Sequence, residues 1–168
     1  MSVVRIHPGA LVAYFAYGAN MAEAVMTEHC PGHSMLGVAE LPGHRFAFSR
    51  RSIRTGTGVA DVVADPASSV WGVLYEVGDL ATLDAKEGAG WAYDRCEVQV
   101  RIGDRTLTAV TYKVRSPEPV EVPPSDAYID GIVQAARTRG LPSTYVKRIS
   151  EQAAEIASQS APRRSSSR

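Results

Sequence analysis

The sequence lacks the features that mark several classes of protein. It has only two cysteines, Cys30 and Cys96, in 168 residues, which is too few for a disulfide framework, and both are expected as thiols in a reducing compartment. The sequence has 18 lysines and arginines and 18 aspartates and glutamates, so its formal net charge is zero. The overall charge therefore does not favour binding to nucleic acid or to an anionic membrane. The longest charge-free stretch, residues 9–22, is too short to span a bilayer. With no export signal recognised, we expect a cytoplasmic protein without nucleic-acid or membrane partners.

Motifs for metals and nucleotides are also missing. His29, Cys30 and His33 offer three possible ligands, but their spacing matches no zinc pattern. The sequence has neither a Gly-x-Gly-x-x-Gly loop nor a Gly-Lys-Ser/Thr phosphate loop. We therefore expect no metal and no cofactor.

What remains is the composition of one globular domain. Hydrophobic residues make up 45% and charged residues 21%, which is enough apolar material for a substantial core. We expect a single domain over residues 1–156 that begins with an irregular leader at 1–9. The serine- and arginine-rich residues 157–168 are expected to form a disordered tail.

Short apolar runs separated by turn residues predict the elements. Strands are expected at 11–17, 35–41, 45–49, 59–64, 70–77, 94–102 and 106–114, and helices at 21–29, 79–87, 126–138 and 142–156. Pro42-Gly43 and Asp65-Pro66 are expected to separate strands, and Gly103-Asp104 marks a hairpin. The pattern predicts an α+β fold, a small and strongly bent mixed β-sheet or β-barrel flanked by helices, rather than a doubly wound parallel sheet.

Glu87 is the main catalytic candidate. On the predicted helix it shares one face with Leu80 and Leu83, so an acidic side chain lies on the stripe that faces the core. A carboxyl group held in such a place is suited to accept and release a proton as a general acid/base. The alternative is that Glu87 turns outward where the helix frays before Gly88.

The turn from Tyr17 to Met21 is the second candidate. It joins a strand to a helix, where unpaired backbone N–H groups attract carboxylates or phosphates. Gly18 permits close approach of a ligand, and Asn20 is expected either to cap the helix or to contact the ligand. A turn with nothing bound is the alternative.

Several motifs together resemble the γ-glutamylcyclotransferase family. Residues 14–21, Tyr-Phe-Ala-Tyr-Gly-Ala-Asn-Met, resemble the family loop whose usual form is Phe-x-Tyr-Gly-Ser-Asn. Residues 70–75 resemble the family's strand before its catalytic helix, and residues 83–88 resemble the end of that helix, which supplies the catalytic glutamate. Residues 123–128 and 140–145 resemble the family's C-terminal helical pair, so the matches follow in order from about residue 12 to 149.

The resemblance implies a lyase or acyltransferase that cyclises a γ-glutamyl amino acid or γ-glutamyl amine to 5-oxoproline and releases the amine. Glu87 would be the general acid/base, and backbone N–H groups from Gly18 to Met21 would hold the substrate carboxylate. Three tyrosines would line the pocket, where their phenols can bond a carboxylate or the catalytic glutamate. The implied substrate-binding residues are Tyr17, Gly18, Ala19, Asn20, Met21, Tyr93, Tyr112 and Tyr128.

Other possibilities stay open. The same chemistry could remove a γ-glutamyl protecting group in a biosynthetic pathway, or the chain could be a binding module without turnover. Ala19 stands where the family usually has serine, so one side-chain contact to substrate is missing. The basic stretch from Arg45 to Arg54 could meet an acidic leaving group or a carrier protein, or could serve solubility at a sheet edge. The leaving group and the oligomeric state are not specified by the sequence.

Overall fold

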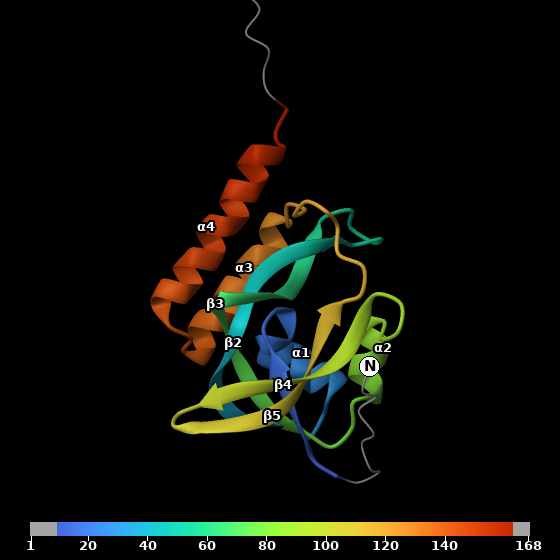
Figure 1. The fold of residues 1–168 in the computed structure, drawn as a ribbon. Coiled ribbons are helices and arrows are strands. Elements are labelled where there is room, and N and C mark those ends of the chain that lie inside the picture. Colours follow the sequence, from blue (N-terminus) through green and yellow to red (C-terminus); the bar gives the residue numbers. More distant parts are fainter. Residues whose placement is uncertain (1–9, 163–168) are drawn as a thin grey trace, which may run out of the picture.

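The computed structural model describes residues 10–162, in which five strands close into a barrel (Figure 1). Around the barrel the order is β1-β3-β2-β4-β5. Every neighbouring pair is antiparallel except β1 and β5, which run parallel and meet at Tyr14 and Val110. The strands are β1 Val12–Ala16, β2 Ser34–Arg51, β3 Gly58–Val77, β4 Tyr93–Ile102 and β5 Arg105–Val114. The predicted fold class, a small bent mixed sheet or barrel with flanking helices, is confirmed.

Two of the predicted strand breaks are wrong. Pro42-Gly43 lies inside β2 and Asp65-Pro66 lies inside β3, so four predicted strands are two long ones. The register of β2 against β3 shifts between Pro42 and His44, and Gly43 has a positive φ of 71°. A glycine in that conformation accommodates a bulge, which bends a strand without ending it. The bend lets two strands wrap around the barrel.

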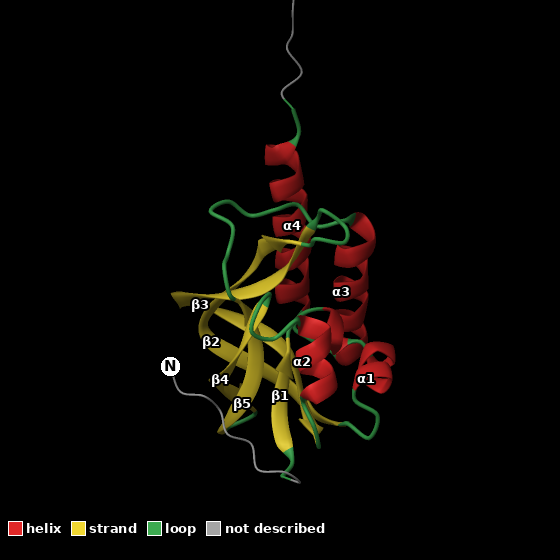
Figure 2. Ribbon diagram, turned by 90° about the vertical axis from the view of Figure 1, so that its right-hand side faces the viewer, coloured by secondary structure: helices red, strands yellow, loops and turns green. Residues whose placement is uncertain are grey.

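The helices cover the barrel on one side (Figure 2). Helix α3 packs beside α4 and also contacts β3 and the short 3-10 helix η1. The bounds are η1 Ala19–Met21, α1 Glu23–His29, α2 Ala81–Glu87, α3 Asp126–Arg139 and α4 Ser143–Ser160. Within residues 10–162 no helix is both long enough and apolar enough to cross a membrane.

All four helix ranges differ slightly from the prediction, and the start of α1 and the end of α4 change the interpretation. Asn20 lies in η1, and its side chain caps no helix, because α1 begins only at Glu23 after the N-cap Ala22. Helix α4 continues to Ser160, so residues 157–160 are helical and do not belong to a tail. Ile156 still packs on the core at 8% exposure, which holds the end of this helix. The predicted leader at 1–9 and residues 163–168 lie outside the described residues.

Candidate active site

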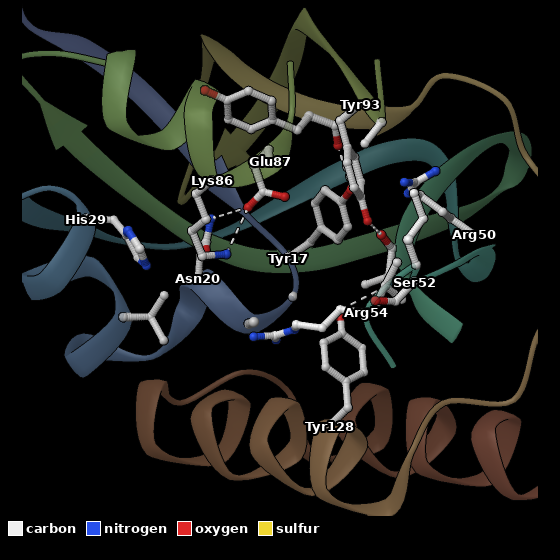
Figure 3. A pocket seen from close by; sticks show the side chains of 18 of the residues that line it. Tyr17, Asn20, His29, Arg50, Ser52, Arg54, Lys86, Glu87, Tyr93 and Tyr128 are labelled. Carbon is white, nitrogen blue, oxygen red and sulfur yellow. Dashed lines mark hydrogen bonds and ion pairs between the residues drawn. The ribbon is translucent and has the colours of Figure 1, made fainter. Parts of the chain in front are cut away.

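A cavity of about 840 Å³ opens beside η1, the end of α2 and the β2–β3 connection (Figure 3). All predicted site residues line it except Met21. The lining residues are Tyr14, Tyr17, Gly18, Ala19, Asn20, Val25, Glu28, His29, Arg50, Ser52, Ile53, Arg54, Val59, Ala60, Lys86, Glu87, Trp91, Ala92, Tyr93, Tyr112 and Tyr128. Residues from nine helices and strands and from the loops between them therefore meet at one pocket.

Glu87 enters this pocket from the last turn of α2. The helix stops there because Gly88 adopts a left-handed conformation, with a φ of 62°, which terminates helices. Leu80 and Leu83 are buried on the same face, and the Glu87 side chain is 17% exposed. Its Oε1 accepts a hydrogen bond from Asn20 Nδ2 at 2.9 Å and lies 3.2 Å from Lys86 Nζ. In the described chain Oε2 has no partner, so one carboxylate oxygen is available to a ligand.

Asn20 connects the turn after β1 to Glu87. Its side chain is 4% exposed, and Nδ2 donates both to Glu87 Oε1 and to Tyr14 Oη, at 2.8 Å for the latter. Burial, followed by the charge of Glu87, raises the pKa of Tyr14 well above its ordinary value, so the phenol stays neutral. Asn20 Oδ1 is buried and has no hydrogen-bond partner among the described residues. Sequence reasoning missed Tyr14, because no local pattern indicates a contact to residues on two other elements.

The turn itself offers fewer donors than the sequence suggested. The N–H group of Met21 donates to Gly18 O at 3.0 Å inside the 3-10 turn, and the Met21 side chain is fully buried. Met21 was therefore wrongly expected at the ligand surface. In the described part of the chain, the N–H groups of Gly18, Ala19 and Asn20 donate to no protein acceptor. These three groups remain available at the pocket wall.

Arg139 of α3 holds this turn from behind. Its Nε donates to Met21 O at 3.0 Å, and the Tyr75 hydroxyl donates to the same carbonyl at 2.8 Å. The guanidinium also bonds Glu23 at the start of α1 and the Tyr75 hydroxyl, the latter at 3.1 Å. Helix α3, strand β3 and helix α1 thus fix the position of η1.

Tyr93 and Tyr128 both attach to the backbone of Ala60. The Tyr93 hydroxyl donates to Ala60 O at 2.9 Å, and the Tyr128 hydroxyl accepts from Ala60 N at 3.0 Å. Burial raises the pKa of Tyr128 to about 12 and raises that of Tyr93 further. Neither hydroxyl bonds Glu87, contrary to one expectation, and the two rings serve as walls.

Tyr112 bonds a carboxylate other than Glu87. Its hydroxyl donates to Asp84 Oδ1 at 2.6 Å, and Arg95 lies 3.0 Å from Asp84 Oδ2. Burial, with this hydrogen bond second, raises the pKa of Tyr112. Tyr17 donates in turn to the backbone oxygen of Tyr112 at 2.5 Å. Sequence reasoning also missed Asp84, although it lies three residues before Glu87 on the same helix.

The described residues contain no group of three or more His, Cys, Asp or Glu side chains arranged to hold a metal ion. His33 bonds Glu23 and the carbonyl of Cys30 instead of forming a ligand set with His29. Cys30 itself is a free, buried thiol.

Known proteins match both the sequence and the fold. The model of the AIG2-like family matches residues 69–149. Bovine gamma-glutamylcyclotransferase is 29% identical over 154 residues, which cover 87% of this chain and 81% of the bovine protein. Human gamma-glutamylcyclotransferase is 28% identical over 144 residues, covering 81% of this chain and 76% of the human protein.

Solved structures agree. The structure of a gamma-glutamyl cyclotransferase superposes with a TM-score of 0.78 at 25% identity, covering 89% of this chain and 99% of the other. The crystal structure of a human protein described as uncharacterized superposes with a TM-score of 0.77 at 28% identity. The match covers 83% of this chain and 86% of the human chain. The chain is thus similar to AIG2-like proteins over residues 69–149 and to γ-glutamylcyclotransferases in sequence and fold. The resemblance drawn from its motifs is confirmed.

Proposed function

We propose that this protein is a γ-glutamylcyclotransferase that converts a γ-glutamyl amino acid or amine to 5-oxoproline and the free amine. The observation that carries the proposal is the carboxylate of Glu87, which is held by Asn20 in a pocket that also contains the unpaired N–H groups of η1. The relatives named gamma-glutamylcyclotransferase support the same activity. A cytoplasmic setting and a small-molecule substrate belong to the proposal.

The η1 turn holds the γ-glutamyl end of the substrate. The N–H groups of Gly18, Ala19 and Asn20 bind its α-carboxylate, because unpaired donors at such a junction attract anions. The missing serine hydroxyl at Ala19 leaves these backbone donors unchanged. The tyrosine walls keep the substrate chain folded, so that its α-amine lies close to its own γ-carbonyl carbon. Such an intramolecular arrangement removes much of the entropic barrier to ring closure.

Glu87 moves the proton. The α-ammonium first releases one proton to solvent and becomes the neutral, nucleophilic amine. As the amine nitrogen forms a bond to the γ-carbonyl carbon, it gives a second proton to the free Oε2 and keeps one hydrogen in the ring. The protonated Glu87 then delivers that proton to the leaving nitrogen as the bond from the γ-carbon to this nitrogen breaks. General acid/base catalysis of this kind contributes roughly 10²–10⁴-fold to the rate. Asn20 keeps Oε1 occupied, so Oε2 is the oxygen that faces the substrate.

The direct test is to incubate the purified protein, with a chelator present, with a panel of γ-glutamyl dipeptides and γ-glutamyl amines. The proposal expects 5-oxoproline and the free amine by mass spectrometry for some of them. Thermal stabilisation by several of these compounds with no product from any would instead support a binding module. A role in deprotecting a biosynthetic intermediate keeps the same products and would appear as a strong preference for a large leaving group.

A further inference from the structure

The arginines of the basic stretch divide into two pairs with different surroundings. Arg45 faces Glu121 at 3.9 Å, and Arg51 donates to the carbonyl of Gly56, so both act within the protein. Arg50 and Arg54 instead line the pocket. Figure 3 shows Arg50 beside Tyr93 and the Arg54 side chain extending over the pocket near Tyr128. Only one pair of this stretch is therefore placed to meet a ligand.

A bulge accounts for the position of Arg50. The register of β2 against β3 shifts between Ala47 and Arg50, and four consecutive residues, 46–49, are buried there. Bulges interrupt the alternation of a strand and redirect the side chains that follow. After the bulge Arg50 pairs with Val59 and its guanidinium stacks on the ring of Trp91, 5.3 Å from the centroid. The stacking holds this cation at the pocket wall.

Within residues 10–162, neither pocket arginine has an anionic partner. Among the described residues no carboxylate forms an ion pair or hydrogen bond with Arg50 or Arg54. Lys86, the third cation of the pocket, is already paired with Glu87 at 3.2 Å. Unpaired cations at a partly enclosed site favour the binding of anions.

A count of substrate charges shows what these arginines would bind. In the proposed function the η1 turn takes the α-carboxylate of the γ-glutamyl group and Glu87 takes its ammonium. The carboxylate of a simple leaving amino acid would occupy one guanidinium. The second guanidinium has no partner unless the leaving group carries another negative charge. Resting on the proposed function, we propose that Arg50 and Arg54 form an anion subsite that selects leaving groups with an acidic side chain.

The test compares γ-glutamyl-glutamate with γ-glutamyl-glutamine, which have nearly the same shape and differ in one charge. We expect kcat/KM to favour the glutamate compound by about tenfold, as one hydrogen-bonded charge typically provides, with the preference shrinking as salt increases. Arg50→Gln and Arg54→Gln should each reduce the preference, and the double variant should abolish it. Arg45→Gln is the matched control, because Arg45 lies on the same strand as Arg50 but outside the pocket. This variant should keep the wild-type preference for the glutamate compound.

Binding measurements on a variant without turnover test the anion subsite independently of the cyclisation reaction. In a Glu87→Gln background, calorimetry should give the same preference for the glutamate compound, and adding Arg50→Gln and Arg54→Gln should remove it. Equal affinity for the two compounds, or an equal loss for both on substitution, would overturn the subsite while leaving the cyclisation intact. A clear binding preference without any 5-oxoproline from the wild type would instead remove the proposed function and keep the subsite. Failure to bind either compound would overturn the subsite, and the panel of γ-glutamyl compounds would then decide the proposed function separately.

Discussion

The amide nitrogen of Asn20 lies 2.9 Å from Glu87 Oε1 and 2.8 Å from the Tyr14 hydroxyl, so one side chain joins β1, η1 and the end of α2. Asn20 is buried, and a buried amide that bonds two partners has little freedom to move. Glu87 is therefore held in one orientation, with Oε2 directed at the pocket. Its position depends on contacts that are 67 residues apart in sequence.

Asn20→Ala should lower kcat by about 10²-fold, because a small displacement of a catalytic group has an effect of that size. The free energy of unfolding should fall by about 1–3 kcal/mol, since the substitution leaves buried partners unsatisfied. Tyr14→Phe is the matched control, because it keeps the bond from Asn20 to Glu87. Steady-state kinetics and thermal unfolding measure both effects, and equal kcat values for the two variants would disprove the positioning role.

Arg139→Lys should raise KM and leave kcat less affected. A lysine cannot reproduce the forked donors that bind Met21 O, Glu23 and Tyr75 together, so η1 would lose its support from α3. Arg137→Lys, an exposed position on the same helix, provides the control. If both variants bind γ-glutamyl dipeptides with wild-type affinity, the turn does not depend on Arg139.

Tyr112→Phe should lower the free energy of unfolding by about 1–2 kcal/mol, because it removes a hydrogen bond to a carboxylate. Arg95→Gln removes the other partner of Asp84 and so breaks a partly exposed ion pair. This substitution should lower the free energy of unfolding by only about 0–1 kcal/mol. Urea unfolding of the two variants compares them. A larger effect from Arg95→Gln would mean that the ion pair, and not the phenol, holds Asp84.

Alkaline pH should destabilise the protein. Burial is the largest cause of a raised pKa for every one of the seven tyrosines, and it brings Tyr128 from 10.0 to about 12. The folded state therefore keeps protons that the unfolded state loses above about pH 10, so this stabilisation is complete below pH 10 and is lost as pH rises toward the folded pKa. Each tyrosine that ionises only on unfolding contributes about 1.4 kcal/mol per pH unit.

Thermal unfolding midpoints should consequently fall steeply above about pH 10, with phenolate absorbance appearing together with unfolding. Tyr128→Phe should make the decline less steep. Phenolate absorbance that rises at an ordinary pKa while the protein stays folded would contradict the burial of these phenols.

Much of the fold follows from local sequence patterns. The alternation of β4 and β5 and the Gly103-Asp104 turn predicted their hairpin, which the register from Ile102 to Arg105 confirms. Pro42 and Asp65 misled the prediction, because turn residues inside a bulged strand have the same composition as residues between two strands. The closing parallel contact of β1 with β5 depends on distant pairing that no local pattern encodes.

The site residues also fall into two groups, those that local sequence patterns indicate and those that only contacts between distant elements bring together. The location of Glu87, Gly18, Ala19 and Asn20 at the pocket could be predicted, since helix periodicity and a strand-to-helix junction are local signals. Tyr14 and Asp84 could not, because their contacts lie between elements. The basic stretch was recognised from the sequence, but only the structure shows that Arg50 and Arg54 line the pocket while Arg45 and Arg51 do not. Asn20 was recognised, but its side chain bonds Glu87 across the fold instead of capping a helix nearby.

Glu87→Gln tests the central claim most directly. Glutamine keeps the size of the side chain and can still accept from Asn20, so the variant should unfold near the wild-type temperature and bind γ-glutamyl dipeptides. Its rate of 5-oxoproline formation should be lower by at least about 10²-fold, because the amide cannot carry the proton. Glu28→Gln, the other carboxylate at the pocket, should remain active. A Glu87→Gln variant that forms 5-oxoproline at close to the wild-type rate would contradict the proposed mechanism.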